Sequence, residues 1–552
     1  MLIFGDALSK LREALRREFP EIDPENVDFD KSGHSDVTVK IFSLIRSSNM
    51  DTASVISRIS TLARQLGFVT EVSGTGGYVN ISIDPMWMLE AINREVEGTG
   101  RYPDIFQDPE RVSVEHTSTN PTGPIHIGRA RNSIIGDSIA RLYARCGYRV
   151  TTQYFVNDSG KQVASLYAGY KKYCSAKKAS IGELLEAYRS IYRDLEKDAD
   201  TEKSIQKIIQ LYESGDPDTI SGIREVCSTM LDGIVSSLRS IGINIDDYTW
   251  ESSFIRTGEL SSIIESLDDY LRDDNGAKYI EVQGRKVYLT RSDGTSLYFS
   301  RDIAYHLYKA NNFDVMVDIL GEDHKDHAMI LSHVLKDLMG VQQTIKFVFY
   351  SYVNLETGKM STRKGNAVNL DDLLSRALME SKEIVKMKRP DLTGDKIDEI
   401  AHAVAVSAVR FNMVRLNSSK PITFKWSEAL NFEGDSAPFI MYAYARASSI
   451  LRKSGTEFKK EYSAPNKYEA DLIKRIYMYP YVLQNALVNL RPEEIATYSL
   501  ELVRTFNSFY LNCPVITSSD YERNLRINLV FAFRTVISDA ANILGIRVLE
   551  EM

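Results

Sequence analysis

Residues 111–156 read RVSVEHTSTNPTGPIHIGRARNSIIGDSIARLYARCGYRVTTQYFV, and this stretch decides the fold. Its first five residues alternate like a β-strand, and residues 118–124 form a polar loop that contains proline. Residues 130–145 carry apolar side chains at helical spacing, and residues 148–155 resemble a second strand. Strand, loop, helix and strand in this order make a βαβ unit, which predicts a parallel sheet with a right-handed crossover.

The loop that precedes the predicted helix carries the first chemical signal, His126-Ile127-Gly128-Arg129. Ligands of parallel sheets bind beyond the C-terminal ends of the strands, where this loop lies. Gly128 lets a ligand approach the backbone, and a helix start offers free N–H groups and partial positive charge. A buried structural histidine is the alternative for His126 alone. The strand before it and the helix after it favour a phosphate contact.

A second signal lies more than two hundred residues away, where residues 359–365 read KMSTRKG after a predicted strand at 346–352. Cations such as Lys359 and Arg363 stabilise the charge that develops on a leaving pyrophosphate. An ordinary charged surface turn is the alternative for this segment alone. Together with the His126 segment, it predicts a site that holds a nucleoside triphosphate from two sides.

Composition and missing motifs exclude several other classes of protein. The 552 residues carry a net charge of −8, so composition alone would not nominate a nucleic-acid binder. No apolar run reaches the roughly 18 residues of a membrane span, and no secretion leader is evident, so a cytoplasmic protein is expected. The four cysteines form no CxxC pair, which argues against zinc and against a disulfide framework. Phosphate-loop, dinucleotide-binding, serine hydrolase and metalloprotease motifs are missing.

The pattern along the chain predicts three domains. Residues 1–97 alternate helical and strand patterns and form an α+β unit. Residues 98–378 hold the βαβ unit and further strands, interrupted by a charged helical insertion at about 161–270. Residues 379–552 are helical throughout and indicate an all-α bundle. The expected fold class is therefore α/β, with a Rossmann-like parallel-sheet catalytic domain between an N-terminal α+β domain and a C-terminal helix bundle.

The two chemical segments are similar to the signatures of class I aminoacyl-tRNA synthetases, usually written HIGH and KMSK. Within that class the chain resembles the arginyl-tRNA synthetases, and archaeal members above all. The likeness covers nearly the whole chain, through residues 114–124, 130–132, 155–160, 292–295, 298–306, 321–324, 442–447, 506–510 and 544–552. Two positions depart from the class pattern. Arg129 stands where histidine is usual, and Thr362 replaces the last lysine.

The resemblance implies a set of residues for each substrate. Catalysis falls to His126, Gly128, Arg129, Lys359 and Ser361. ATP binding falls to Pro124, His126, Gly128, Asp323, His324, Lys359 and Met360. Arginine binding falls to Glu115, Asn120, Tyr298, Asp302 and Glu322. Carboxylates and an aromatic ring suit a planar guanidinium with five donors. In the C-terminal bundle, tRNA binding falls to Tyr442, Arg446 and Tyr510.

The implied activity is that of an arginine–tRNA ligase, with tRNA bound before arginine is activated. ATP would convert arginine to arginyl-adenylate, and the 3′ end of tRNA(Arg) would accept the arginyl group. ATP is expected to carry Mg²⁺, while the protein itself is expected to hold no metal and no zinc. A cytoplasmic monomer with no membrane partner is expected.

Several alternatives stay open at the level of sequence. Asp302 could pair with Arg301 or cap a helix, and His324 and His327 are spaced to share a metal on one helix face. The chain could be a synthetase for another amino acid. It could be a tRNA-binding relative without catalysis, since Arg129 departs from the signature, or an unrelated nucleotidyltransferase with a similar sheet.

Overall fold

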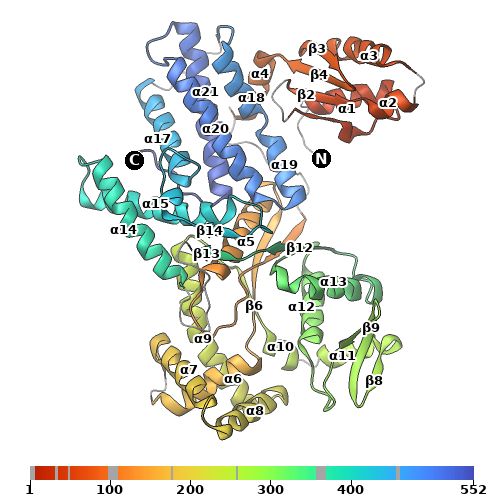
Figure 1. Ribbon diagram of the computed structural model, residues 1–552, viewed down its shortest axis with the longest axis vertical. Helices are drawn as coiled ribbons and strands as arrows, with labels where there is room; N and C mark the ends of the chain where they lie inside the picture. Colours follow the sequence, from red (N-terminus) through yellow and green to blue (C-terminus); the bar gives the residue numbers. More distant parts are fainter. Residues whose placement is uncertain are drawn as a thin grey trace.

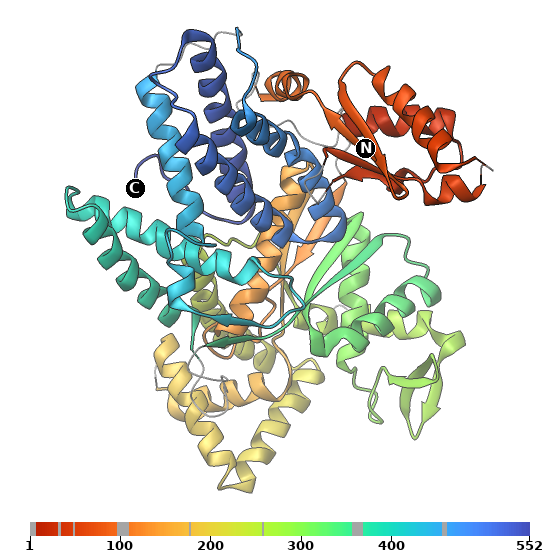
Figure 2. The ribbon, with the colours of Figure 1, turned by 45° about the horizontal axis from the view of Figure 1, so that its top comes forward.

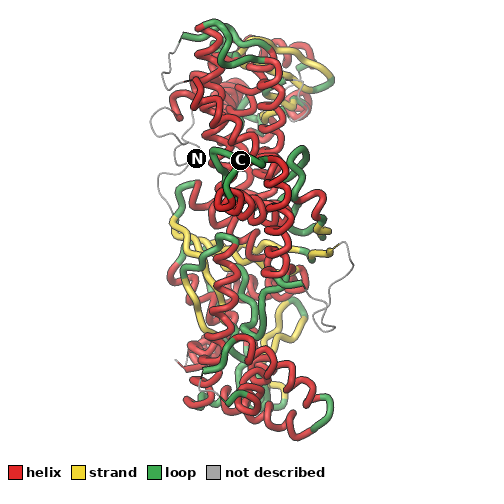
Figure 3. Tube along the Cα trace, turned by 90° about the vertical axis from the view of Figure 1, so that its left-hand side faces the viewer, coloured by secondary structure: helices red, strands yellow, loops and turns green. Residues whose placement is uncertain are grey.

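A computed structural model describes residues 7–30, 35–47, 50–96, 110–175, 178–256, 259–355, 368–454 and 461–552. A parallel sheet occupies the middle of an elongated molecule (Figure 1). The N-terminal unit and the C-terminal helices lie at one end of the molecule. Two groups of inserted elements, α6–α9 and α10–α13, lie toward the other end. The side view shows how narrow the molecule is in the third direction (Figure 3).

The central sheet confirms the predicted parallel arrangement. Its strands are β5 (Arg111–Glu115), β6 (Arg149–Val156), β7 (Asp247–Trp250), β11 (Val315–Gly321) and β12 (Thr344–Tyr350). They lie in the order β12-β11-β5-β6-β7, and every neighbouring pair is parallel. After β5 the chain adds β6 and β7 on one side of that strand, and it later adds β11 and β12 on the other side. The switch point of this doubly wound sheet therefore lies between β5 and β11.

Helix α5 (Ile127–Arg145) connects β5 to β6 and is buried along nearly its whole length. It starts three residues before the predicted position because His126 caps it. Ile134 and Ile139 are buried in the apolar core, while Arg131 and Asp137 are buried with hydrogen bonds to Met413 and Arg410 of the C-terminal helices. Since polar and apolar sides are both covered, α5 forms the centre of the molecule.

The helical insertion between β6 and β7 is shorter than the sequence suggested. It comprises α6 (Gly160–Tyr173), α7 (Ile181–Leu195), α8 (Ala199–Glu213) and α9 (Pro217–Ser240). The predicted insertion at about 161–270 overlooked β7, which returns to the central sheet beside β6. Strand β7 has only four residues, and its polar and apolar side chains do not alternate clearly, so the sequence did not indicate a strand there.

The second group of inserted elements follows β7 and lies on the other side of the sheet edge, away from α6–α9 (Figure 2). It comprises α10 (Glu251–Arg256), α11 (Glu259–Ser266), the antiparallel strands β8 (Arg272–Asp274), β9 (Ala277–Val282) and β10 (Arg285–Tyr288), and α12 (Tyr298–Asn312). Helix α13 (Lys325–His333) follows β11. Just before α12, Ser296 makes an isolated antiparallel bridge with Thr290.

The N-terminal unit has the α+β character that the sequence predicts. An antiparallel sheet joins β1 (Val27–Phe29), β2 (Val37–Lys40), β4 (Tyr78–Ile83) and β3 (Val69–Thr75) in that order. Its helices are α1 (Ala7–Glu18), α2 (Phe42–Ser47), α3 (Thr52–Arg64) and α4 (Pro85–Val96). The unit docks on α18 (Lys467–Tyr477), where the Ala7 amide donates to the Tyr477 hydroxyl at 2.9 Å and Lys474 pairs with Asp36 at 3.0 Å.

The C-terminal part is the predicted helix bundle. It comprises α14 (Leu370–Lys388), α15 (Gly394–Val414), α16 (Trp426–Ala429), α17 (Ala437–Ser454), α18, α19 (Tyr479–Asn489), α20 (Pro492–Asn512) and α21 (Asp520–Ile543). The boundary expected at residue 378 falls inside α14. A short parallel pair, β13 (Val353–Leu355) with β14 (Ile422–Phe424), also ties the bundle to the end of the sheet. No helix in these described ranges is long and apolar enough to cross a membrane.

A buried charge cluster fixes α12 against the C-terminal ends of β5 and β11. The Lys309 ammonium is fully buried and donates to Glu115 at 2.9 Å and to Asp318 at 2.6 Å. The other oxygen of Asp318 contacts Nε2 of His306 at 2.7 Å. Burial alone would raise the pKa of Asp318, but the charge of Lys309 and the contact with His306 hold it well below its usual range. Every charge in the cluster therefore has a partner, as buried charges require.

Replacing Lys309 with methionine should destabilise the protein by about 3–5 kcal/mol, because it leaves two carboxylates buried without their cation. Urea denaturation followed by circular dichroism measures this loss. Lys207→Met, at an exposed position of α8, is the matched control and should change the unfolding midpoint little. Equal stability of the two variants would contradict the structural role of Lys309.

Candidate active site

The loop after β5 begins with a left-handed turn at the switch point. Thr117 and Ser118 have φ of 72° and 32°. The Asn132 side chain of α5 holds this turn, accepting from the Thr117 amide at 2.5 Å and donating to the Ile319 carbonyl of β11 at 2.7 Å. One amide group therefore fixes β5, β11 and α5 relative to one another at the crevice where ligands of such sheets bind.

His126 is the N-cap of α5, and its ring is half-buried at the mouth of that crevice. Its Nδ1 accepts from the Gly128 amide at 3.1 Å, which leaves the ring proton on Nε2 when the histidine is neutral. Burial, together with the nearby Arg129, lowers the pKa of His126 and so favours the neutral form. Nε2 is therefore a donor at the positive end of a helix, which suits a phosphate oxygen.

Gly128 leaves room for the His126 ring, which lies close to it. A Cβ at Gly128 would lie only 3.0 Å from Cε1 of His126. Any larger residue would therefore push the imidazole away from the helix start. The small residue in the first signature thus keeps the histidine in place as well as leaving room for a ligand.

The chain that follows the second signature pairs with the backbone of the first. Lys359, Met360, Ser361, Thr362 and Arg363 lie outside the described residues. The chain resumes at Val368, whose carbonyl accepts from the Ile127 amide at 3.1 Å, and the Leu370 amide donates to the Ile125 carbonyl at 2.8 Å. The end of the KMSTRKG segment is therefore followed, three residues later, by direct pairing with the His126 turn.

The two arginines that follow Gly128 have different environments. Arg129 is half-buried and its guanidinium reaches the hydroxyl of Tyr350, the last residue of β12, at 3.4 Å. Arg131 is fully buried and donates to the carbonyls of Ser351 at 2.7 Å and Lys420 at 2.8 Å. The departure from the usual histidine thus brings a charged side chain between α5 and β12.

The residues expected to contact adenosine and the amino-acid backbone lie on exposed loops. Glu322, Asp323 and His324 form a short 3-10 helix directly after β11, on the β11 side of the switch point. Asn120 lies in the loop after β5, where its amide donates to Gln162 of α6 at 3.0 Å. Pro124 is exposed in the same loop. These side chains are open to solvent and available to a ligand.

Tyr298 and Asp302 lie one helical turn apart at the start of α12. The Tyr298 ring is half-exposed, and its hydroxyl lies against Gly160 at the start of α6. Asp302 contacts Nε2 of His327 on α13 at 2.6 Å, and this hydrogen bond raises the pKa of His327. Asp302 is therefore not the partner of Arg301, which was the sequence alternative. The exposed parts of Tyr298 and Asp302 therefore present an aromatic ring and a carboxylate to a ligand.

Glu115, expected to be a second acidic partner for arginine, has both carboxylate oxygens occupied within the protein. One accepts from Ser118 at 2.9 Å and the other from Lys309 at 2.9 Å. The residue is nearly buried beneath the loop after β5. The contact of Glu115 with arginine stays a prediction. In such a contact, arginine would bind carboxylate oxygens that already accept hydrogen bonds from Ser118 and Lys309.

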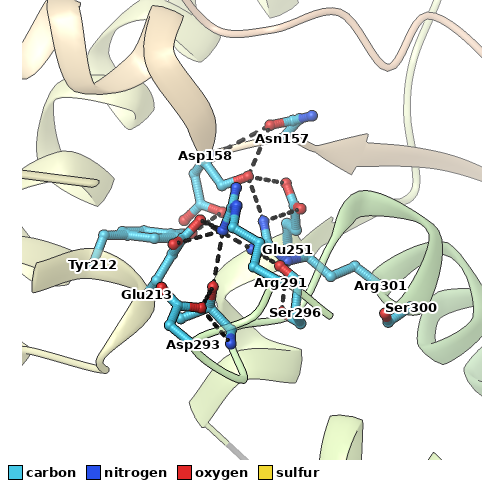
Figure 4. Close-up of polar contacts among 12 residues, drawn as sticks. Asn157, Asp158, Tyr212, Glu213, Glu251, Arg291, Asp293, Ser296, Ser300 and Arg301 are labelled. Atoms are coloured by element: carbon cyan, nitrogen blue, oxygen red, sulfur yellow. Dashed lines mark hydrogen bonds and ion pairs between the residues drawn. The ribbon is translucent and has the colours of Figure 1, made fainter. Parts of the chain in front are cut away.

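A buried ionic network, shown in Figure 4, supports the start of α12 and was not found by sequence reasoning. Arg301 donates to Glu251 at 2.8 Å and to Ser159 at 2.9 Å, and Ser159 donates to the other oxygen of Glu251 at 2.7 Å. Glu213, at the end of α8, accepts from Arg291 at 2.8 Å and lies 3.6 Å from Arg301. The network therefore connects the helical insertion to the helix that carries Tyr298 and Asp302.

Part of this network left a signal in the sequence. Ser159 and Arg301 lie inside the family-like segments 155–160 and 298–306, so their positions were marked although their contacts were not. Glu213 and Glu251 lie in stretches that gave no motif. Within the described ranges no three His, Cys, Asp or Glu side chains gather to hold a metal, and His327 pairs with Asp302 rather than sharing a ligand with His324.

The three residues expected to contact tRNA lie together on the bundle. The Arg446 guanidinium lies 4.9 Å from the Tyr442 ring centroid and 4.7 Å from that of Tyr510, and it donates to Asn507 at 2.7 Å. Both tyrosines are partly exposed and line a groove of about 660 Å³. Exposed aromatic faces beside a cation suit stacked, unpaired bases.

Comparisons with known proteins agree with this geometry. Residues 98–426 match the family described as tRNA synthetases class I (R), catalytic domain, and residues 440–552 match the DALR anticodon binding domain. The doubly wound sheet and the capped α5 at its switch point are thus those of a class I aminoacyl-tRNA synthetase.

Curated relatives and solved structures define the family more closely. The chain is 47% identical to the arginine–tRNA ligase of Thermoplasma acidophilum over the full length of both proteins. It is 36% identical to that of Methanocella arvoryzae, with 96% of each chain covered. The arginyl-tRNA synthetase of Thermus thermophilus superposes with a TM-score of 0.86 at 25% identity, covering 99% of both chains. The chain belongs to the arginyl-tRNA synthetase family.

Replacing His126 with alanine should lower the rate of ATP–pyrophosphate exchange by about 10²–10³-fold, the usual cost of removing one donor to a developing anion. His126→Asn is the matched control, because asparagine caps a helix well but cannot place a donor where Nε2 lies. We expect both variants to be slow, with the asparagine variant the more stable to heat. Full activity of His126→Asn would show that the ring serves only as a cap.

Proposed function

We propose that this protein is an arginine–tRNA ligase. It activates arginine with ATP to form arginyl-adenylate and pyrophosphate, and then transfers the arginyl group to the 3′ end of tRNA(Arg). The observation that carries the proposal is the pair Tyr298 and Asp302 at the start of α12, in a chain that matches arginine–tRNA ligases over its full length. An aromatic face beside a carboxylate is the chemistry that a guanidinium requires.

ATP binds in the crevice at the switch point, with its triphosphate over the start of α5. Support comes from the Nε2 donor of His126 at the positive end of α5 and from the close backbone approach that Gly128 permits. Asp323 and His324, exposed after β11, contact the adenosine side. Mg²⁺ arrives with ATP and is held by phosphate and water oxygens, the ligands that it prefers.

Arginine lies beside ATP, between the loop after β5 and α12. Its guanidinium pairs with Asp302 and packs on the ring of Tyr298. Asn120 and Glu322 bind the α-amino end, and Glu115 completes the acidic lining from below. The guanidinium is planar and always charged, so a fixed carboxylate selects it over a neutral side chain of similar length.

The protein accelerates the reaction by positioning and by charge stabilisation. The arginine carboxylate attacks the α-phosphorus in line, and pyrophosphate leaves. His126 and Arg129 stabilise negative charge from the α5 side, while Lys359 with Ser361 and Met360 of the second signature act from the opposite side. The neutral state of His126, favoured by its lowered pKa, keeps its donor in place across neutral pH.

The tRNA extends over all three domains. The N-terminal domain, residues 1–97, contacts the outer corner of the tRNA, and the bundle, residues 379–552, binds the anticodon through Tyr442, Arg446 and Tyr510. The stacking of Arg446 between the two tyrosines supports this assignment. Arginine activation requires bound tRNA, and the protein works as a cytoplasmic monomer.

Charging of a defined tRNA transcript tests the activity directly. Labelled arginine should be attached to tRNA(Arg) in the presence of ATP and Mg²⁺, and pyrophosphate exchange should occur only when tRNA is present. A panel of the other amino acids should give no exchange. Activation of a different amino acid, or tRNA binding without any charging, would contradict the proposal.

Replacing Asp302 with asparagine should raise the KM for arginine about 10- to 150-fold, because a hydrogen bond to a charged group contributes about 1.5–3 kcal/mol. The KM for ATP should change little. Asp326→Asn is the control, since Asp326 is an exposed acid on the neighbouring α13 that pairs with Arg285. Steady-state charging assays measure both constants. An unchanged KM for arginine in Asp302→Asn would place the guanidinium elsewhere.

A further inference from the structure

His327 shares a carboxylate with the proposed arginine site. Its Nε2 lies 2.6 Å from Oδ2 of Asp302, and its ring meets the edge of Phe299 at a centroid distance of 5.2 Å. The imidazole is 39% exposed and Asp302 is 30% exposed, so both groups border the open crevice. Phe299 and Asp302 come from the same turn of α12, and α13 supplies the histidine.

Asp302 binds a cation more weakly when a second cation already occupies its carboxylate. A guanidinium binds a carboxylate best through two parallel hydrogen bonds, one to each oxygen, and it carries a full positive charge. A neutral imidazole that donates from Nε2 holds one oxygen and leaves the negative charge of Asp302 intact. A protonated imidazole makes the same contact but neutralises that charge and adds a second cation beside the substrate.

We propose that His327 is a positioning residue for the arginine pocket, which orients Asp302 when neutral and competes with the substrate guanidinium for Asp302 when protonated. This inference rests on the proposed role of Asp302 in binding arginine. Arginine binding then favours the neutral imidazole, and the proton of His327 is released to solvent. Arginine would bind more weakly wherever that proton must first be removed.

Several other charged groups around α13 have their own partners. On α13 itself Asp326 pairs with Arg285 of β10 at 3.4 Å, and His333 pairs with Asp337 at 2.5 Å. Before α13, His324 lies 3.7 Å from Asp323. The lysines of the adjoining π-helix and β12 reach elsewhere, Lys336 to the Gln343 carbonyl at 2.6 Å and Lys346 to the Tyr143 hydroxyl at 3.4 Å. In this part of the described structure, Asp302 is the group that sets the charge state of His327.

The direction of the pH effect follows from this contact. Asp302 raises the pKa of His327 in the ligand-free protein. A bound guanidinium lowers that pKa again, because a second cation disfavours the protonated ring. Proton binding and arginine binding therefore oppose each other. The KM for arginine should be lowest above the raised pKa of His327 and should rise as pH falls through it.

Kinetics of the full-length enzyme with tRNA, between pH 6 and pH 8.5, test the proposal. We expect the wild-type KM for arginine to fall by about tenfold as pH rises over this window. In His327→Gln the KM should be nearly independent of pH, because glutamine retains an N–H donor but does not titrate. His333→Gln, on the same helix, is the control and should keep the wild-type slope. The KM for ATP should not show this dependence on pH in any of the three proteins.

Calorimetry on the wild type provides a readout that needs no variant. Arginine binding to the enzyme–tRNA complex, measured at neutral pH in two buffers of different ionisation enthalpy, should show net proton release. A flat wild-type KM, an unchanged slope in His327→Gln or an absence of proton release would overturn the inference. If arginine is not a substrate at any pH, the proposed function fails instead, so the two failures are distinguishable.

Discussion

The active-site crevice depends on one buried guanidinium. Arg131, on the second turn of α5, is fully inaccessible to solvent and donates to the carbonyls of Ser351, Lys420, Asn417 and Met413 at 2.7–3.4 Å. Burial lowers its pKa to about 10, so it stays charged at neutral pH. Since these hydrogen bonds all go to backbone carbonyls, Arg131 fixes main chain from two domains around the start of one helix.

This arrangement holds the chain on either side of the second signature close to α5. Ser351 follows β12, and the chain leaves for the second signature a few residues later, after β13. It returns at Val368 to pair with the His126 turn. A second buried arginine, Arg410 of α15, pairs with Asp137 of α5 and donates to the carbonyls of Ile241 and Leu544. Helix α5 thus connects the nucleotide crevice rigidly to the helix bundle. The parts of the protein that bind the two substrates of the transfer step therefore keep a fixed position relative to each other.

The sequence predicted what local patterns encode. Strands β5, β6 and β12 and helix α5 were found because apolar periodicity and flanking polar loops specify them, and the parallel sheet followed from the βαβ order. Strand β7 was missed because four residues carry no reliable period. The partners of Arg301 were beyond sequence reasoning, since Glu213 and Glu251 come from segments distant in sequence and carry no motif.

The central claim is that one triphosphate lies over the start of α5 while a guanidinium lies against Asp302. A crystal structure of the protein with tRNA(Arg), arginine and a non-hydrolysable ATP analogue tests it most directly. We expect phosphate oxygens within hydrogen-bond distance of Nε2 of His126, with Lys359 on the opposite side of the nucleotide. The substrate guanidinium should lie against Asp302. Nucleotide bound away from the β5–β11 switch point, or Lys359 turned away from its phosphates, would contradict it.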